Sequence, residues 1–163
     1  MAKKKVDPLN RKQYQGLTPS LIVSDIKAAV SFYNKAFGFT SRGIMKGPDG
    51  KPMHAELSLR GSTLMLAPEN PAWGTQSAKA IGATPATLYI LVENVDKVFA
   101  KALKLGATVK MPVADMFWGD RVGTLVDPDG NPWMVATHKE DLTLQEMNKK
   151  MKAQFQPQAS AKA

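Results

Sequence analysis

Ser20-Leu21-Ile22-Val23-Ser24-Asp25-Ile26 opens a pattern that returns as Tyr89-Ile90-Leu91-Val92-Glu93-Asn94-Val95. Both stretches are apolar runs that end near an Asp or Asn residue, and a helical spacing of apolar residues follows each of them. The stretches 61–67 and 130–136 are related by the same offset. Because a unit of this length occurs only twice, the pattern indicates two similar modules and not a solenoid.

Each module is expected to contain one helix and four strands. The first helix is predicted over 26–37, because Asp25 is a suitable N-cap and apolar residues recur with a helical period. The second helix is predicted over 95–105, after Asn94. Strands are predicted over 18–23, 39–46, 52–60, 62–67, 86–92, 107–111, 119–126 and 131–137. The expected fold class is α+β, with two βαβββ modules forming a curved mixed sheet around a shared cavity and the helices outside.

The segments outside the modules are assigned from composition and capping signals. These signals divide the chain into a flexible basic arm over 1–15, the first module over 16–70, a linker over 71–85, the second module over 86–140, a C-terminal helix over 141–156 and a disordered tail over 157–163. The linker is rich in Pro, Gly and Ala, and its Trp73 could cover a site. In the last helix Thr143 and Glu146 form a capping box. Its apolar stripe is expected to pack on the domain, with a dimer contact as the alternative; the stripe consists of Leu144, Met147, Met151 and Phe155.

The composition excludes several classes of function. The chain has no cysteine, so disulfides, thiolate metal sites and thiol nucleophiles are absent. Its net charge of +8 is concentrated in the two ends, which does not favour a nucleic-acid-binding surface. No apolar run approaches the roughly 20 residues of a membrane span. The basic N-terminus lacks an apolar signal region, so a cytoplasmic location is expected.

Motifs in both modules resemble those of one superfamily. Val-Ser-Asp at 23–25, Ser-Phe-Tyr at 31–33 and Phe-Gly-Phe at 37–39 lie early, and Asp-Pro-Asp-Gly-Asn-Pro-Trp at 127–133 lies late. Over residues 17–138 the chain resembles the vicinal oxygen chelate superfamily, which includes glyoxalases, bleomycin-resistance proteins and extradiol dioxygenases. Met53-His54-Ala55-Glu56-Leu57 and the segment around His138 look more narrowly like the PhnB-like branch. Functions in that branch are largely undefined, so the resemblance does not name a reaction.

The resemblance also implies where a metal would bind. In the enzymes of the superfamily each module offers a His near the start of its first strand and a Glu on its last strand. In this chain the corresponding positions are Thr18 and Thr87, and Met65 and Met134. Hydroxyls and thioethers are poor ligands for divalent cations that prefer imidazole or carboxylate. We therefore expect neither a metal nor another cofactor.

Strand alternation predicts which side chains line the cavity. His54, Glu56 and Ser58 are expected to face it, and in the second module Arg121 and Gly123. The predicted ligand-binding residues are Thr18, Ser20, Met65, Thr87, Tyr89, Trp118, Arg121 and Met134. Such a lining suits a small, partly apolar or planar molecule, with Arg121 available for an anionic group.

The polar residues leave alternatives open. His54 and Glu56 are either a polar pair on a solvated face, ligand contacts, or an acid/base or metal-binding pair. His138 is expected to bond locally to Glu140 and Asp141, and Asp120 with Arg121 to form an ion pair.

Three functions fit the sequence. The first is a metal-free homodimer that binds a small molecule. The second is a lyase, isomerase or dioxygenase-like enzyme that uses a relocated metal or acid/base chemistry around His54, Glu56 and His138. The third is an interaction protein that works through its basic ends.

Overall fold

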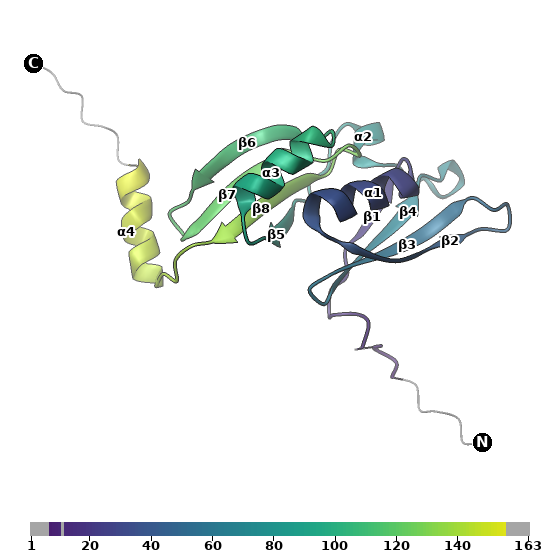
Figure 1. The fold of residues 1–163 in the computed structure, drawn as a ribbon, viewed down its shortest axis with the longest axis horizontal. Helices are drawn as coiled ribbons and strands as arrows, with labels where there is room; N and C mark the ends of the chain where they lie inside the picture. Colours follow the sequence, from purple (N-terminus) through teal and green to yellow (C-terminus); the bar gives the residue numbers. More distant parts are fainter. Residues whose placement is uncertain (1–6, 11, 156–163) are drawn as a thin grey trace, which may run out of the picture.

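The computed structural model describes residues 7–10 and 12–155, and they form two βαβββ modules (Figure 1). The first module consists of β1 (Ser20–Val23), α1 (Ile26–Phe37), β2 (Thr40–Lys46), β3 (Pro52–Leu59) and β4 (Ser62–Pro68). The second module consists of β5 (Leu88–Leu91), α3 (Val95–Lys104), β6 (Thr108–Asp115), β7 (Asp120–Val126) and β8 (Pro132–His138). The strand orders β1-β4-β3-β2 and β5-β8-β7-β6 are equivalent, and only β1–β4 and β5–β8 are parallel pairs. The predicted α+β class and module order are confirmed.

Local signals place the helix ends where the sequence predicts them. The Asp25 carboxylate accepts a hydrogen bond from the amide of Ala28, and Gly38 ends α1 with φ 80°. The 71–85 linker contains two short elements that the sequence did not predict. They are η1 (Pro71–Trp73), capped by Asn70, and α2 (Ala78–Ile81), capped by Ser77.

The two modules lie side by side with their helices on one side (Figure 1). Helix α1 packs against α3. Trp133 of β8 packs against α1, with ring centroids 4.9 Å from Phe37 and 5.3 Å from Tyr33. The face of each sheet that its own helix leaves uncovered, here called the open face, therefore points the same way in both modules. The open faces lie beside each other, and the two modules share a hollow of about 490 Å³ at their junction, lined in part by Leu59, Tyr89 and Leu91.

A buried carboxylate network also joins the modules. Asp127 is 4% exposed and accepts hydrogen bonds from Tyr33 Oη of α1 (2.6 Å) and from Trp133 Nε1 (2.9 Å). Asp129 accepts hydrogen bonds from the amide (2.8 Å) and the hydroxyl (2.7 Å) of Ser24. The predicted turn over 127–130 is confirmed by the hydrogen bond from the Gly130 amide to the Asp127 carbonyl. Its two carboxylates, which the sequence suggested only as turn residues, hold the modules together.

The last helix, α4 (Leu144–Phe155), stands away from the sheets (Figure 1). The capping box is confirmed, because the Glu146 carboxylate accepts from the Thr143 amide and the Thr143 hydroxyl donates to the same carboxylate. The apolar stripe packs on the domain less closely than expected, with the Phe155 ring 6.4 Å between centroids from that of Phe117. Within the described part of the chain α4 buries none of its residues, and Leu144 and Phe155 are 71% and 70% exposed. The predicted tail over 157–163 and residues 1–6 of the predicted arm lie outside the described residues.

Among the described residues, no helix is long and apolar enough to cross a membrane.

Candidate functional site

The open face of the first module carries the polar residues that the sequence placed there. Ala55 and Leu57 of β3 are buried beneath α1, so His54 and Glu56, which alternate with them, lie on the open face. Met65 pairs with Glu56 on one side and with Ser20 of β1 on the other. Glu56, Met65 and Ser20 therefore form a row across the sheet, as predicted.

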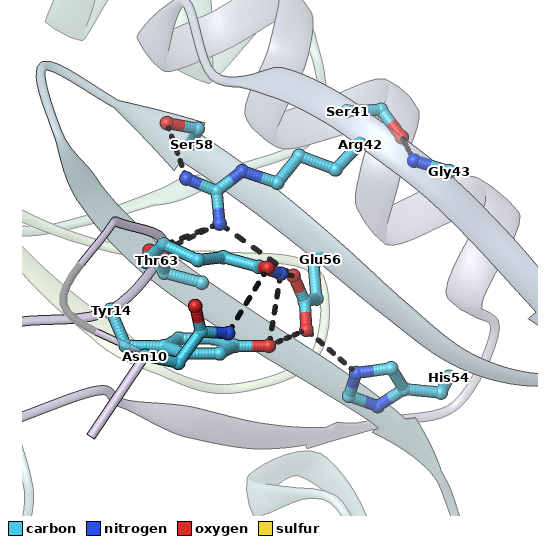
Figure 2. Close-up of polar contacts among 10 residues, drawn as sticks. Asn10, Tyr14, Ser41, Arg42, Gly43, His54, Glu56, Ser58 and Thr63 are labelled. Atoms are coloured by element: carbon cyan, nitrogen blue, oxygen red, sulfur yellow. Dashed lines mark hydrogen bonds and ion pairs between the residues drawn. The ribbon is translucent and has the colours of Figure 1, made fainter. Parts of the chain in front are cut away.

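Six residues, one of them Glu56, form a polar cluster on this face (Figure 2). This Glu56 cluster consists of Gln13, Tyr14, Arg42, His54, Glu56 and Thr63. Glu56 accepts hydrogen bonds from Tyr14 Oη and from Gln13 Nε2, the latter at 2.7 Å. His54 Nε2 lies 3.7 Å from Glu56 Oε1, and Arg42 Nη1 lies 3.6 Å from Oε2. The cluster thus surrounds one carboxylate with four partners from three separate segments of the chain.

The charge state of Glu56 follows from these contacts. The hydrogen bond from the Tyr14 hydroxyl is the largest cause that lowers the pKa of Glu56, and the same bond raises the pKa of Tyr14. Glu56 is therefore an anion at neutral pH and acts as an acceptor rather than as a general acid.

The sequence analysis missed Arg42 and the two residues of the N-terminal segment. The pairing of β2 with β3 shifts register between Ser41 and Gly43, and Gly43 has φ 126°. Arg42 lies at this bulge, on the open face, where Nη1 donates to Thr63 Oγ1 at 2.9 Å. A glycine inside a predicted strand is a signal for such a bulge. Gln13 and Tyr14 carried no comparable local signal.

The same open face continues into a hollow at the ends of β1 and β4. The hollow has a volume of about 490 Å³ and is lined by Ile22, Pro52, Ala67, Trp73 and neighbouring residues of the 47–53 turn. Ala67 pairs with Ile22, two residues along the strands from the Met65–Ser20 pair. The indole of Trp73 is 76% exposed at the edge of the hollow. The linker residue that the sequence analysis considered as a cover for a site thus lines this hollow.

The second module carries its own cluster of polar groups on the open face. This Asp120 cluster consists of Tyr89, Trp118, Asp120, His138 and Asp141. Asp120 accepts hydrogen bonds from Tyr89 Oη (2.6 Å) and Trp118 Nε1 (3.1 Å), and His138 Nδ1 lies 2.7 Å from its other oxygen. His138 Nε2 lies 3.1 Å from Asp141, so the predicted local contact with Asp141 is confirmed, and Asp120 is an additional partner.

Burial and hydrogen bonding act together in this cluster. Burial, with the hydrogen bond to Asp120, raises the pKa of Tyr89 to about 12. Burial alone would raise the pKa of Asp120, but the hydrogen bonds from Tyr89, His138 and Trp118 lower it below its usual value. The hydrogen bond to Asp120 is the largest cause that raises the pKa of His138. The imidazolium is thus favoured, with an anion at each ring nitrogen.

The predicted orientation of Arg121 is wrong. Its guanidinium donates to both carboxylate oxygens of Asp96 on α3, at 2.9 and 2.8 Å, and to Asp115 at 3.2 Å. A Cβ at Gly123 would lie 2.6 Å from Phe99 of α3, so Gly123 faces the helix as well. Arg121 therefore lies on the helix-covered face, and its ion pairs are with Asp96 and Asp115 instead of Asp120.

The other predicted residues divide between the two modules. Met134 pairs with Tyr89 and with Thr124, and it faces away from the buried Trp133 and Val135. Thr18 is half-buried and Thr87 exposed, just before β1 and β5. The alternative enzyme site would combine His54 and Glu56 with His138. Within one chain these residues belong to the Glu56 cluster and the Asp120 cluster respectively, and the structure does not bring them together.

The residues at the positions that could hold a metal do not fit one. Met65 and Met134 lie on the open faces, each beside a hydroxyl residue of the neighbouring strand, Ser20 and Tyr89. A thioether and an uncharged hydroxyl do not provide the basicity that a divalent cation requires. Across residues 7–10 and 12–155 no group of three or more His, Cys, Asp or Glu side chains is placed to bind a metal ion.

The fold agrees with comparisons to known proteins. The family model of the glyoxalase/bleomycin resistance protein/dioxygenase superfamily matches residues 15–135. The chain belongs to this superfamily. Protein Rv0887c of Mycobacterium tuberculosis is 37% identical over 141 residues, which covers 85% of this chain and 83% of that protein. Protein Mb0911c of Mycobacterium bovis is also 37% identical over 141 residues, which covers 85% of this chain and 93% of that protein.

Two solved structures share the fold. TioX from Micromonospora sp. ML1 has a TM-score of 0.60 at 25% identity, covering 76% of this chain and 98% of that one. Protein PA1353 from Pseudomonas aeruginosa has a TM-score of 0.62 at 23% identity, covering 77% and 99%.

The raised pKa of His138 predicts a pH-dependent stability. Because its pKa in the folded chain lies above the usual histidine value of about 6.5, protonation of His138 stabilises the fold. This contribution is fully present below pH 6.5 and is lost as the pH rises through the folded pKa. The urea midpoint should therefore fall as the pH rises above 6.5, and His138→Gln should flatten that dependence. If the urea midpoint depended on pH equally in His138→Gln and in the unchanged protein, the contacts with Asp120 and Asp141 would not favour the protonated form of His138.

Proposed function

We propose that this member of the superfamily is a metal-free, small-molecule-binding protein. The observation that carries the proposal is the hollow on the open face of the first module, between Ile22, Ala67 and Trp73. A concave, largely apolar lining with a few polar groups suits binding of a small molecule with a planar or apolar part. The thioether of Met65 extends the same face toward Glu56. The substituted metal-ligand positions favour binding over metal-assisted chemistry.

The proposal includes a homodimer and a cytoplasmic location. The open faces carry large apolar side chains that one chain leaves in solvent, with Met45 57%, Tyr89 46% and Leu91 44% exposed. A second copy laid against these faces would cover them and close the predicted cavity. Assignment to the PhnB-like branch is also proposed, supported by the Met53–Leu57 motif and by a helix that follows His138.

Thermal-shift measurements with a panel of planar, partly apolar molecules test the binding function. Compounds that bind should raise the unfolding midpoint of the unchanged protein. Trp73→Ala should weaken that binding by about tenfold, because the exposed indole lies over the hollow. Ala67→Lys should abolish it by filling the hollow with a charged side chain.

Arg121→Gln is the matched control, since Arg121 lies on the other face of its sheet. It should keep the affinity of every bound compound within about twofold. Elemental analysis and sedimentation complete the test. A stoichiometric transition metal in the purified protein, or a monomer at all concentrations with and without bound compound, would contradict the proposal.

A further inference from the structure

The N-terminal segment, residues 12–16, occupies part of the proposed binding face. Gln13 and Tyr14 are half-buried there, and Thr63 beneath them is only 3% exposed although it lies on the open face. The Gln13 carbonyl accepts from Thr63 Oγ1 (2.9 Å) and from Arg42 Nη1 (3.2 Å). The segment is thus bound by its main chain as well as by its side chains (Figure 2).

The contacts define what the sheet recognises. Glu56 accepts hydrogen bonds from the phenol of Tyr14 and from the side-chain amide of Gln13. Arg42 and Thr63 both donate to the main-chain carbonyl oxygen of Gln13. Every group that the segment contributes is electrically neutral. The sheet contributes one anion, Glu56, and one cation, Arg42. Their nearest side-chain atoms lie 3.6 Å apart, and their charges are equal and opposite.

We propose that Glu56, Arg42 and Thr63 form a recognition site for a neutral phenol that carries an amide carbonyl, and that Gln13 and Tyr14 occupy this site until such a molecule displaces them. The phenol donates to Glu56, and the carbonyl accepts from Arg42 and Thr63, as the segment does now. A carboxylate in place of the carbonyl is disfavoured, because its charge would lie beside Glu56 in a partly buried setting.

This inference rests on the proposed function, whose ligand class it specifies. Glu56 pairs with Met65, and Ala67 on the same strand and face reaches the hollow beside Trp73. The phenolic amide therefore binds at the polar end of the face, and any further apolar part extends along Met65 toward the hollow.

Trypsin cleavage after the exposed Lys12 reports whether the segment is bound, because a protease needs the following residues in extended, free form. The full-length chain is used, and the fragment that begins at Gln13 is quantified by mass spectrometry. Tyr14→Phe and Gln13→Ala each remove a hydrogen bond to an anion and should raise the cleavage rate about tenfold. Gln15→Ala is the matched control, since the exposed Gln15 should leave the rate unchanged. Equal rates in all four proteins would overturn the proposal.

The ligand class is tested with N-acetyl-L-tyrosinamide, whose acetyl carbonyl stands for that of Gln13. It should accelerate cleavage of the unchanged protein and bind Tyr14→Phe about tenfold more tightly. N-acetyl-L-phenylalaninamide, which lacks the hydroxyl, should do neither. Faster cleavage in the variants without an effect of the tyrosinamide would refute the recognition site. The broader function fails separately if Trp73→Ala and Ala67→Lys leave the binding of every panel compound unchanged while the tyrosinamide still releases the segment.

Discussion

Replacing Asp127 by alanine should lower the free energy of unfolding by about 3–5 kcal/mol. The carboxylate is buried and accepts from Tyr33 Oη, from Trp133 Nε1 and from both the amide and the side chain of Asn131. Alanine leaves these donors buried without an acceptor, and each such group costs about 1–3 kcal/mol. Urea denaturation followed by far-ultraviolet circular dichroism measures the change.

A turn of the same type in the first module, between β2 and β3, provides a control. In this turn, Gly47-Pro48-Asp49-Gly50, a glycine takes the first position, so a turn of this type does not need a carboxylate there. Asp49, at the third position, has a side chain that is 59% exposed and accepts from the Lys51 amide. Asp49→Ala should therefore cost less than about 1 kcal/mol. Losses of the same size for Asp127→Ala and Asp49→Ala would show that the buried network does not hold the modules together.

The position of this network matters for binding. It connects α1 of the first module to β8 of the second, through Tyr33 and Trp133, and so keeps both helices on one side. With the helices there, both open faces point the same way and remain available to a ligand or to a second chain. A loss at Asp127 should therefore weaken the proposed dimer together with the stability of the fold.

The sequence predicts the elements well because periodicity and caps are local properties. On β3, apolar residues alternate strictly with polar ones, and the face of His54 and Glu56 follows directly. On β7 the same reasoning fails. Val122 and Thr124 on the open face and Leu125 on the helix-covered face are all buried, so burial does not alternate along this strand and its pattern of polarity does not place Arg121.

The Glu56 cluster could be predicted only in part for a similar reason. Glu56 and His54 are two residues apart, whereas the bonds from Gln13 and Tyr14 to Glu56 join positions distant in the sequence. A basic segment at the chain end carries no local signal of such a contact. The apolar stripe of α4 is likewise visible in the sequence, but what would cover it depends on tertiary or quaternary contacts.

Gly130→Ala should destabilise the protein by about 2–5 kcal/mol, through two effects that add. Gly130 has φ 88°, a left-handed conformation that costs an alanine about 1–2 kcal/mol. The added Cβ would also lie 2.5 Å from the backbone nitrogen of Lys79 and 2.9 Å from the carbonyl carbon of Ala78. Because these are backbone atoms, α2 must move, and overpacking of this kind costs about 1–3 kcal/mol. Thermal and urea unfolding measure the sum.

Gly50→Ala separates the two effects. Gly50 is the last residue of the 47–50 turn between β2 and β3, which has the same type; it has φ 77°, and no described atom lies within 4 Å of its added Cβ. It should therefore show the conformational cost alone, about 1–2 kcal/mol. The difference between the variants measures how firmly α2 is held on the 127–130 turn, where the Lys79 amide donates to the Asp129 carbonyl at 2.7 Å. Since α2 anchors the linker that carries Trp73, Gly130→Ala should also weaken binding in the hollow. Equal losses of stability in the two variants would mean that α2 is not held firmly on the 127–130 turn.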